Sequence, residues 1–215
     1  MLELKEIYFH PATSQKPILK KISLKANYGH PTIIQGSSGS GKTSLIEVIS
    51  GLSRPQKGLI EWQGKSLNLR QRKSLCGVIF QFPERHFLGL TVTHELRLGH
   101  LRLSGEDQYK VLSKVGLSEI KMTQPPERLS GGQQRRLAIA VQLLKKPKIL
   151  LLDEPTAGLD WSVRDEVIEL IKELSKERLI IVVTHEPELF KNLSIDSYHL
   201  HYGELKLMSK LPLVE

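Results

Sequence analysis

The chain is poor in cysteine and lacks any long apolar run. Cys76 is the only cysteine among its 215 residues, so an internal disulfide is excluded and a reducing compartment is indicated. No apolar run approaches the ~20 residues that a membrane-spanning helix needs. The opening stretch MLELKEIYF contains acidic residues and does not read as a secretory signal. We therefore expect a soluble chain, and any work at a membrane would need another chain to span it.

The composition is otherwise ordinary. Hydrophobic residues make up 40% of the chain and charged residues 25%, which suits one globular α/β domain or one core with a subdomain. The net charge of +8 permits contact with nucleic acid, anionic lipid or an acidic partner. Because the basic residues occur in short groups and form no long tail, we interpret most of them as a solvated surface.

Four short apolar runs predict strands of a largely parallel sheet. Unbroken runs of this kind suit strands buried on both faces. Each run ends on polar residues or on a glycine loop, and ligands of parallel α/β sheets bind at the carboxyl ends of the strands. We therefore expect four separate segments of the chain to place side chains at one edge of the sheet, where the carboxyl ends of the strands lie. The runs cover residues 31–35, 78–80, 149–152 and 179–183.

Residues 42–49 are predicted to form a helix because they follow the glycine loop directly. Helical spacing of apolar residues predicts a helix over residues 162–175 and another within the segment that begins at LSGGQQRR. Residues 83–128 contain several glycines and prolines and are predicted to form a helical insertion with loops. The predicted fold is α/β, with a mostly parallel sheet, an amino-terminal antiparallel β segment and an inserted α-helical subdomain. The residues that predict the antiparallel segment are Leu2, Leu4, Ile7, Phe9, Ile22 and Leu24.

Residues 36–43 read GSSGSGKT and fit a phosphate-binding loop between a predicted strand and a predicted helix. Backbone N–H groups of such a loop turn toward one anion, and the helix N-terminus adds a favourable dipole. We expect Lys42 to reach the β- and γ-phosphates and the Thr43 hydroxyl to bind Mg²⁺. A glycine-rich turn capping a helix would explain the glycines but not the Lys-Thr pair. The predicted nucleotide-binding residues here are Gly36, Ser37, Ser38, Gly39, Ser40, Gly41, Lys42, Thr43 and Ser44.

Polar residues follow each of the other three predicted strands. Asp153 would hold Mg²⁺, mostly through water, and Glu154 would polarise the attacking water as a general base. His185 can contact the γ-phosphate and hold the base and the water in line, and the Gln81 amide can bind Mg²⁺ or the water. The predicted catalytic residues are therefore Glu154, His185 and Gln81, and the predicted metal ligands are Thr43, Gln81 and Asp153.

Residues 129–136 read LSGGQQRR and contain no carboxylate or histidine. Ser130 and Gln133 have the spacing of a capping box at a helix start. Gly131 and Gly132 open that helix despite their conformational cost, and they would let an anion approach its bare N–H groups. Since residues 36–43 already provide a phosphate loop, we expect this second helix end to act on a nucleotide held by another subunit.

Together these motifs resemble the ATP-binding subunit of ABC transporters, and the resemblance covers nearly the whole chain. GSSGSGKT resembles its Walker A motif, ILLLDE its Walker B motif and residues 184–185 its switch. The resemblance identifies Leu129, Ser130, Gly131, Gly132 and Gln133 as the signature, and AGLD, ending at Asp160, as the D-loop. It implies an ATPase with a RecA-like P-loop fold that uses ATP and Mg²⁺. The implied domain spans residues 1–215, with a nucleotide-binding core of 1–81 and 147–215 and a helical subdomain of about 82–146.

Residues 77–96 resemble the energy-coupling-factor and cobalt/nickel-type importers. This implies uptake of a metal ion or small micronutrient, a peripheral position at the cytoplasmic face of a membrane, and integral membrane partner subunits. The resemblance also implies a head-to-tail partner ATPase, either an identical copy or a paralogue. The sequence identifies neither the transported substance nor, beyond this resemblance, the direction of transport.

Other interpretations stay open at this point. A non-transport ABC ATPase acting on nucleic acid, ribosomes or cell division would suit the basic charge, although we do not expect nucleic acid as a partner. A monomeric P-loop kinase would leave LSGGQ unexplained. Family members commonly stack an aromatic ring near the first strand on adenine, and Tyr8, Phe9 and His10 are the candidates here, with Pro11 in that position if the register is ungapped. Trp161 stands where a proline often follows the D-loop.

Overall fold

The computed structural model describes residues 1–12, 14, 16–100, 102–193 and 196–208. The chain forms two compact units. The first, unit 1, consists of Met1–Val78, Pro147–Glu154 and Ile171–Glu215, and the second, unit 2, consists of Ile79–Lys146 and Pro155–Leu170.

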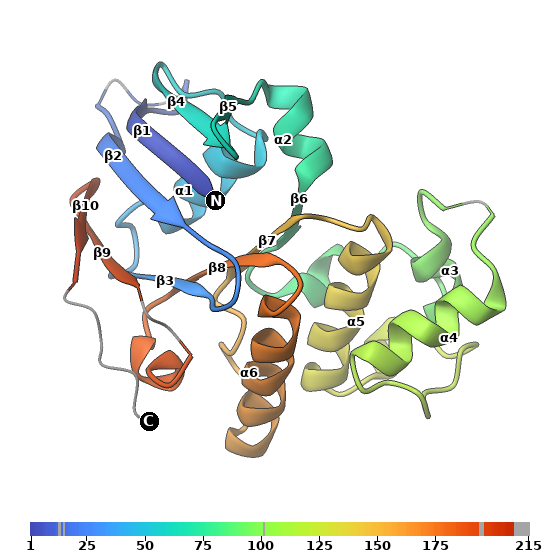
Figure 1. The fold of residues 1–215 in the computed structure, drawn as a ribbon. Helices are drawn as coiled ribbons and strands as arrows, with labels where there is room; N and C mark the ends of the chain where they lie inside the picture. The colour runs from blue at the N-terminus through green and yellow to red at the C-terminus, as the bar shows by residue number, and fades with distance from the viewer. Residues whose placement is uncertain (13, 15, 101, 194–195, 209–215) are drawn as a thin grey trace. The chain divides into compact units, whose positions relative to one another are not determined.

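Unit 1 contains a sheet of six strands in the order β10-β9-β3-β8-β7-β6 (Figure 1). Strands β7, β8, β3 and β9 are parallel to one another, and every residue of β7 and β8 is buried. This explains why their sequences are unbroken apolar runs. The parallel sheet predicted from the sequence is therefore confirmed. The strands are β3 (Thr32–Gln35), β6 (Cys76–Ile79), β7 (Ile149–Asp153), β8 (Leu179–Thr184), β9 (Ser197–His201) and β10 (Glu204–Leu207).

A second sheet in unit 1 is antiparallel and has the order β2-β1-β4-β5. It confirms the predicted amino-terminal β segment. The apolar side chains of β1 and β2 supply its buried face, where Leu2, Ile7 and Ile22 are fully buried. The strands are β1 (Leu2–Phe9), β2 (Leu19–Ala26), β4 (Lys57–Trp62) and β5 (Lys65–Ser66).

Helix α1 (Lys42–Ser50) follows β3 directly after the glycine loop and packs against β7 and β8. Its buried face includes Leu45, Ile46 and Ile49, and the helix ends at Gly51, whose φ of 82° is unfavourable for other residues. Unit 1 also contains α2 (Leu69–Leu75), which begins with a capping box, and the short helix η3 (Pro187–Phe190). Because α1 is anchored on the sheet, the loop before it has a fixed position at the carboxyl ends of the strands.

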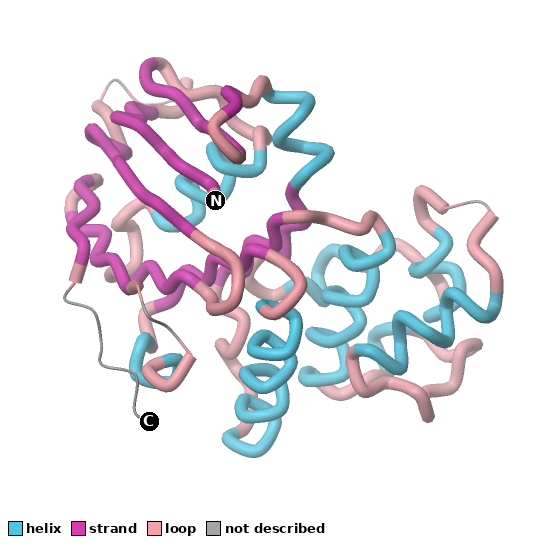
Figure 2. Tube along the Cα trace, viewed as in Figure 1, coloured by secondary structure: helices cyan, strands magenta, loops and turns pink. Residues whose placement is uncertain are grey.

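Unit 2 is helical, as the cyan segments in Figure 2 show. The central helix is α5 (Gly131–Leu144), which contacts α3 (Val92–Arg97), α4 (Gly105–Lys114) and the short helix η1 (Pro83–His86). Its buried residues include Leu137, Ile139 and Ala140. The unit also holds η2 (Pro126–Arg128) and the first part of α6 (Trp161–Ser175), which continues into unit 1. The predicted helical insertion is thus present.

Within the described residues, no helix combines the length and apolarity that crossing a bilayer requires.

Candidate functional site

The loop between β3 and α1 is shaped by glycines. A side chain at Gly36 would lie 2.5 Å from the Leu200 carbonyl oxygen and 2.6 Å from the Ser40 hydroxyl, so only glycine fits there. Gly41 is the N-cap of α1 in the left-handed conformation, with φ 104°, and no side chain caps the helix. The Ser40 hydroxyl is buried without a hydrogen-bond partner among the described residues. A bare helix N-terminus beside an unpaired buried donor is the arrangement that binds a phosphate anion.

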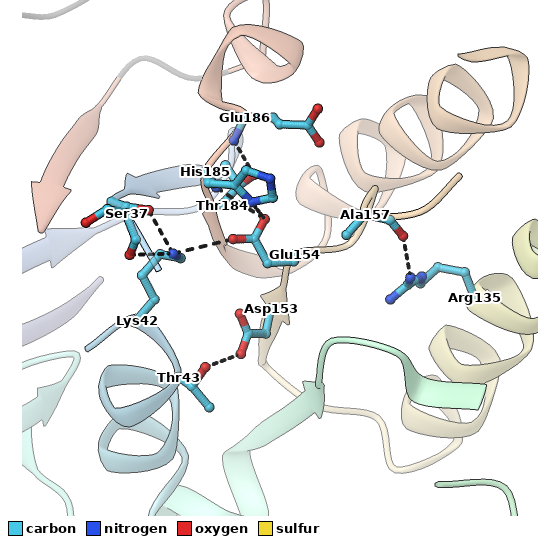
Figure 3. A network of polar contacts seen from close by, with 11 residues as sticks. Ser37, Lys42, Thr43, Arg135, Asp153, Glu154, Ala157, Thr184, His185 and Glu186 are labelled. Carbon is cyan, nitrogen blue, oxygen red and sulfur yellow. Dashed lines mark hydrogen bonds and ion pairs between the residues drawn. The ribbon is translucent and has the colours of Figure 1, made fainter. Parts of the chain in front are cut away.

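Lys42 directs its ammonium group back into this loop (Figure 3). Its Nζ donates to the Gly36 carbonyl at 2.8 Å and to the Ser37 carbonyl at 3.1 Å, and it lies 3.5 Å from Glu154 Oε1. The side chains of Lys42 and Glu154 are 9% and 7% exposed, so the charges face each other away from water. The loop therefore holds one buried ammonium group with one carboxylate opposite it.

Thr43 and Asp153 form the second part of the site. The Thr43 hydroxyl donates to Asp153 Oδ2 at 2.7 Å, and Asp153 is 3% exposed at the end of β7. Burial raises the pKa of the Asp153 carboxyl above its ordinary value. The Thr43 hydrogen bond and the charge of Lys42 lower it, and the charge of Glu154 raises it further.

The pair of Thr43 and Asp153 fits Mg²⁺ by its chemistry. The described residues contain no group of three or more His, Cys, Asp or Glu side chains able to hold a metal. Mg²⁺ does not need one, because it usually takes one or two carboxylates and completes its shell with waters and substrate phosphates. A hydroxyl oxygen and a carboxylate oxygen 2.7 Å apart at the rim of a phosphate loop are suitable donors.

Glu154 lies where the chain turns after β7. Its φ is 48°, and its backbone N–H donates to the Val183 carbonyl of β8 at 2.9 Å. The turn directs its carboxylate toward His185, whose backbone N–H donates to Glu154 Oε2 at 3.2 Å and whose Nδ1 lies 2.9 Å from the same oxygen. The side chain of His185 is 53% exposed. Glu154 thus lies between the ammonium group of Lys42, at the start of α1, and the imidazole of His185, which follows β8 (Figure 3).

Gln81 is the one predicted catalytic residue that lies in the other unit. It is exposed and follows β6 within unit 2, whereas the phosphate loop, Asp153, Glu154 and His185 all belong to unit 1. The structure therefore brings together the side chains of Lys42, Thr43, Asp153, Glu154 and His185. The role of Gln81 stays a prediction.

The signature segment begins α5 in unit 2, and its serine forms the predicted cap. Ser130 Oγ accepts from the Gln133 N–H at 3.3 Å, and Gln133 Oε1 accepts from the Ser130 N–H at 3.0 Å. Leu129 is buried, and Gly131 is exposed. Gly132 is buried, and a side chain there would collide with Val163 of α6. The sequence offered no sign of this packing requirement, which joins two segments far apart in the chain.

The D-loop lies in the same unit, before α6. Asp160 is exposed, and its carbonyl accepts the backbone N–H of Arg164 at 2.9 Å. Trp161 is 74% exposed, with the Arg164 guanidinium 5.3 Å from its ring centroid. Arg135 of α5 was not predicted as a site residue. It is 2% exposed and donates to the Ala157 carbonyl at 3.1 Å, so it fixes the start of the D-loop (Figure 3).

The three aromatic candidates near the first strand differ in burial. Phe9 is 6% exposed and belongs to the core of the antiparallel sheet, so its ring is not available for stacking. Tyr8 and His10 are half-buried. The backbone of His10 is bonded through both its N–H and its carbonyl to the Gln56 amide, at 2.9 Å and 2.8 Å.

Comparisons with known proteins agree with this arrangement. A family model described as "ABC transporter" matches residues 19–157. The chain is 34% identical to the chloroplastic ABC transporter I family member 11 of Arabidopsis thaliana, over 99% of this chain and 82% of that protein. It is 36% identical to the energy-coupling factor transporter ATP-binding protein EcfA2 of Acetivibrio thermocellus, over 85% of this chain and 69% of that protein.

Two solved structures extend the likeness to the fold. CbiO1 from Clostridium perfringens, described as part of the ABC transporter complex cbiONQ, superposes with a TM-score of 0.86 at 27% identity, covering 97% of this chain and 88% of its own. MJ0796, described as a dimeric bacterial ABC transporter cassette, superposes with a TM-score of 0.83 at 27% identity and covers 99% of both chains. The likeness in sequence and fold spans almost the entire chain.

Proposed function

This chain belongs to the ABC transporter family of ATPases, and we propose that it powers uptake of a metal ion or small micronutrient through a membrane partner. The observation that carries the ATPase part of the proposal is the cluster in which Glu154 lies between Lys42 and His185, next to the Thr43–Asp153 pair. This cluster joins an anion-binding loop to a carboxylate that can accept a proton. Those are the two elements that ATP hydrolysis requires.

The phosphate groups of ATP would bind the loop of residues 36–44. Its backbone N–H groups and the Ser40 hydroxyl would donate to phosphate oxygens, and Lys42 would exchange its carbonyl partners for them. When bound, Mg²⁺ would neutralise charge that develops on the phosphates. Thr43 and Asp153 would hold it, together with the predicted ligand Gln81.

Glu154 would act as the general base. Its carboxylate takes a proton from water while the water oxygen forms a bond to the γ-phosphorus and the bond to the ADP oxygen breaks. His185 positions this carboxylate, because both its backbone N–H and its ring contact Glu154 Oε2. The Lys42 ammonium lies on the other side of the carboxylate, 3.5 Å from Glu154 Oε1.

The signature residues would act on ATP held by a second ABC ATPase subunit, either an identical copy or a paralogue. Within this chain, the α5 end has a complete capping box and no charged residue in its first turn, so it supplies backbone N–H groups but no chemistry. Asp160 would lie in the same interface. The description of MJ0796 as a dimeric cassette supports this proposal.

The membrane partner would bind near residues 82–90, at the cytoplasmic face of the membrane. Leu88 and Leu90 are 78% and 79% exposed in this segment, which makes them suitable apolar contacts. The relatives described as an energy-coupling factor ATP-binding protein and as part of a cbiONQ complex support uptake of a micronutrient or a metal ion.

The test is ATP-dependent pairing of the purified chain. Glu154→Gln should bind ATP without hydrolysing it, and should form a dimer that light scattering after gel filtration detects. Adding Ser130→Arg should abolish this dimer by placing a bulky side chain at the α5 end. The matched control is Ser104→Arg, which changes the N-cap serine of α4 in the same way and should leave the dimer intact. A dimer that survives Ser130→Arg would contradict the proposed role of the signature.

A second experiment tests the membrane partner. The full chain extracted in mild detergent should co-purify with an integral membrane protein, and Leu88→Glu should weaken that association. An unchanged association in Leu88→Glu would place the contact elsewhere. Recovery with nucleic acid, in a strongly salt-dependent manner, would favour the non-transport alternative.

A further inference from the structure

A short segment before α3 in unit 2 has its backbone held by side chains of that helix. The Leu88 N–H and the Gly89 N–H both donate to Glu95 Oε2, at 2.8 Å and 2.6 Å. The next N–H along the chain, that of Leu90, donates to His94 Nδ1 at 3.4 Å. Three consecutive backbone N–H groups are therefore bound by two neighbouring side chains of α3.

Glu95 is buried, with 5% of its surface exposed. Burying a carboxylate costs free energy unless hydrogen bonds replace those it makes to water. The N–H groups of Leu88 and Gly89 provide such bonds, and both bonds are charge-assisted. The carboxylate and the segment therefore depend on each other, because removing either one leaves a buried polar group unpaired.

Gly89 allows this close approach of the segment to the helix. It is buried, and a side chain at this position would collide with the backbone nitrogen of Glu95. Helix α3 is itself anchored, since Val92 and Leu96 are fully buried and the Val92 N–H donates to the Gln124 carbonyl at 3.0 Å. The segment is thus held on a helix that has a fixed place in unit 2.

The side chains on either side of Gly89 are turned to solvent. Leu88 and Leu90 are 78% and 79% exposed, although their N–H groups face α3. Single exposed leucines are common on protein surfaces, but two leucines whose backbone is held at both positions form a small apolar projection of defined shape. The folding of this chain gains nothing from their exposure, so the projection is suited to contact with another molecule.

We propose that Glu95 is a positioning residue for docking to the membrane partner, and that its carboxylate holds Leu88 and Leu90 in place to enter an apolar groove of that protein. The inference rests on the proposed function, which puts an integral membrane protein near residues 82–90, and it adds the residue that shapes the contact. The likeness to a protein described as part of an ABC transporter complex supports this occupant. Because the segment is ordered before docking, little conformational entropy is lost when the partner binds.

The first measurement is amide hydrogen exchange of the purified full chain, followed by NMR. Glu95→Ala should speed exchange at Leu88 and Gly89 roughly tenfold, the equivalent of one charge-assisted hydrogen bond, and should leave the amides of α5 unchanged. Glu95→Gln keeps one acceptor oxygen and should lie between Glu95→Ala and the wild type. The matched control is Glu106→Ala, which removes an exposed carboxylate of α4 and should exchange as the wild type does.

The second measurement is binding of the same variants to urea-washed membranes of the cells that naturally produce the chain, detected by flotation. Glu95→Ala should bind roughly tenfold more weakly than the wild type, with Glu95→Gln again between them and Glu106→Ala unchanged. Gly89→Ala is an independent variant, because its methyl group separates the segment from α3 while the carboxylate remains. It should weaken membrane binding as Glu95→Ala does.

The outcomes separate the inference from the function on which it rests. Unchanged exchange at Leu88 and Gly89 in Glu95→Ala overturns the inference, as does unchanged membrane binding in Glu95→Ala and Gly89→Ala. Faster exchange throughout α5 would make Glu95 a residue of general stability and would also overturn it. Equal binding to vesicles of the extracted lipids would replace the protein partner by a lipid surface. If the wild type binds the washed membranes no better than Leu88→Glu does, the partner contact itself fails, and with it the transport part of the proposed function.

Discussion

Helices α1 and α5 both begin in glycine- and serine-rich sequence, yet their N-termini are built differently. The α1 end has a left-handed glycine as N-cap and no side-chain cap, and Lys42, Asp153 and Glu154 surround it. The α5 end has the reciprocal cap of Ser130 and Gln133, with no charged group in its first turn. The first end carries its own chemistry, whereas the second offers only N–H groups. Similar composition therefore occurs at two different helix ends, one beside charged side chains and one capped by its own serine and glutamine.

The glycines at the two ends also serve different purposes. Gly41 is needed for a left-handed backbone, with φ 104°. Gly132 is needed for space, because Val163 occupies the position of any side chain there. A substitution should therefore act on the conformation of the loop in the first case and on helix packing in the second.

The largest effect should come from removing the base at the α1 end. We expect Glu154→Gln to lower kcat for ATP hydrolysis about 10²- to 10⁴-fold, because an amide cannot accept the proton, while ATP still binds. A coupled phosphate-release assay and a binding titration measure the two quantities. Glu188→Gln, at an exposed carboxylate of η3, is the control. Ordinary turnover in Glu154→Gln would show that the α1 end lacks the base.

The second largest effect should come from removing the positive charge at the α1 end, because the first turn of α5 has no charged residue. Lys42→Ala should weaken ATP binding roughly 10- to 100-fold, the equivalent of one or two charge-assisted hydrogen bonds. Gln133→Ala, in the first turn of α5, should leave the ATP affinity of the monomer unchanged. Titration of dilute protein, below the concentration of dimer formation, compares the two. An equal loss of ATP affinity in both variants would show that the two helix ends do not differ in this way.

The third effect concerns stability. Gly132→Ala should lower the free energy of unfolding by about 1–3 kcal/mol, because the added methyl group overpacks against Val163. Gly131→Ala has room, with Leu159 at 3.5 Å, and should change stability by less than about 1 kcal/mol. Urea denaturation measures both. If Val163→Ala fails to rescue Gly132→Ala, the packing explanation is wrong.

The smallest effect is a pH dependence that only the α1 end should show. Burial raises the folded-state pKa of Asp153, so the folded protein binds the proton more tightly than the unfolded chain. Stability from this group is present below the unfolded pKa and is lost as pH rises through the folded pKa. Asp153→Asn lacks this titrating group. As pH rises from the unfolded to the folded pKa of Asp153, the melting temperature of Asp153→Asn should therefore increase relative to that of the wild type. A constant difference between the two at every pH would contradict the shifted pKa.

The sequence predicted the parts that depend on local pattern. GSSGSGKT defines its loop within eight residues, and the cap of Ser130 and Gln133 is set by a spacing of three residues. The buried strands β7 and β8 were recognisable because they are apolar throughout. The roles assigned to the predicted site residues, including Gln81 and Asp160, stay predictions.

Other parts depend on contacts between distant segments, and the sequence alone could not reveal them. The hairpin of β9 and β10 was missed although SYHLH and ELKL alternate polar and apolar residues, because runs of 5 and 4 residues give only a short pattern. The approach of Lys42 to Glu154 depends on the register that aligns Asp153 with Val183 and Gln35 with Thr184. The collision of a residue-132 side chain with Val163 depends on how α5 and α6 pack.

The two tryptophans of the chain give each unit its own optical signal. Trp62 belongs to unit 1 and contacts the edge of the Tyr28 ring at a centroid distance of 5.7 Å. Trp161 belongs to unit 2 and is 74% exposed beside the Arg164 guanidinium. Indole emission shifts to shorter wavelength when water leaves the ring. With Trp62 replaced by phenylalanine, the fluorescence colour of the protein becomes a direct record of whether the surface next to the D-loop is wet or covered.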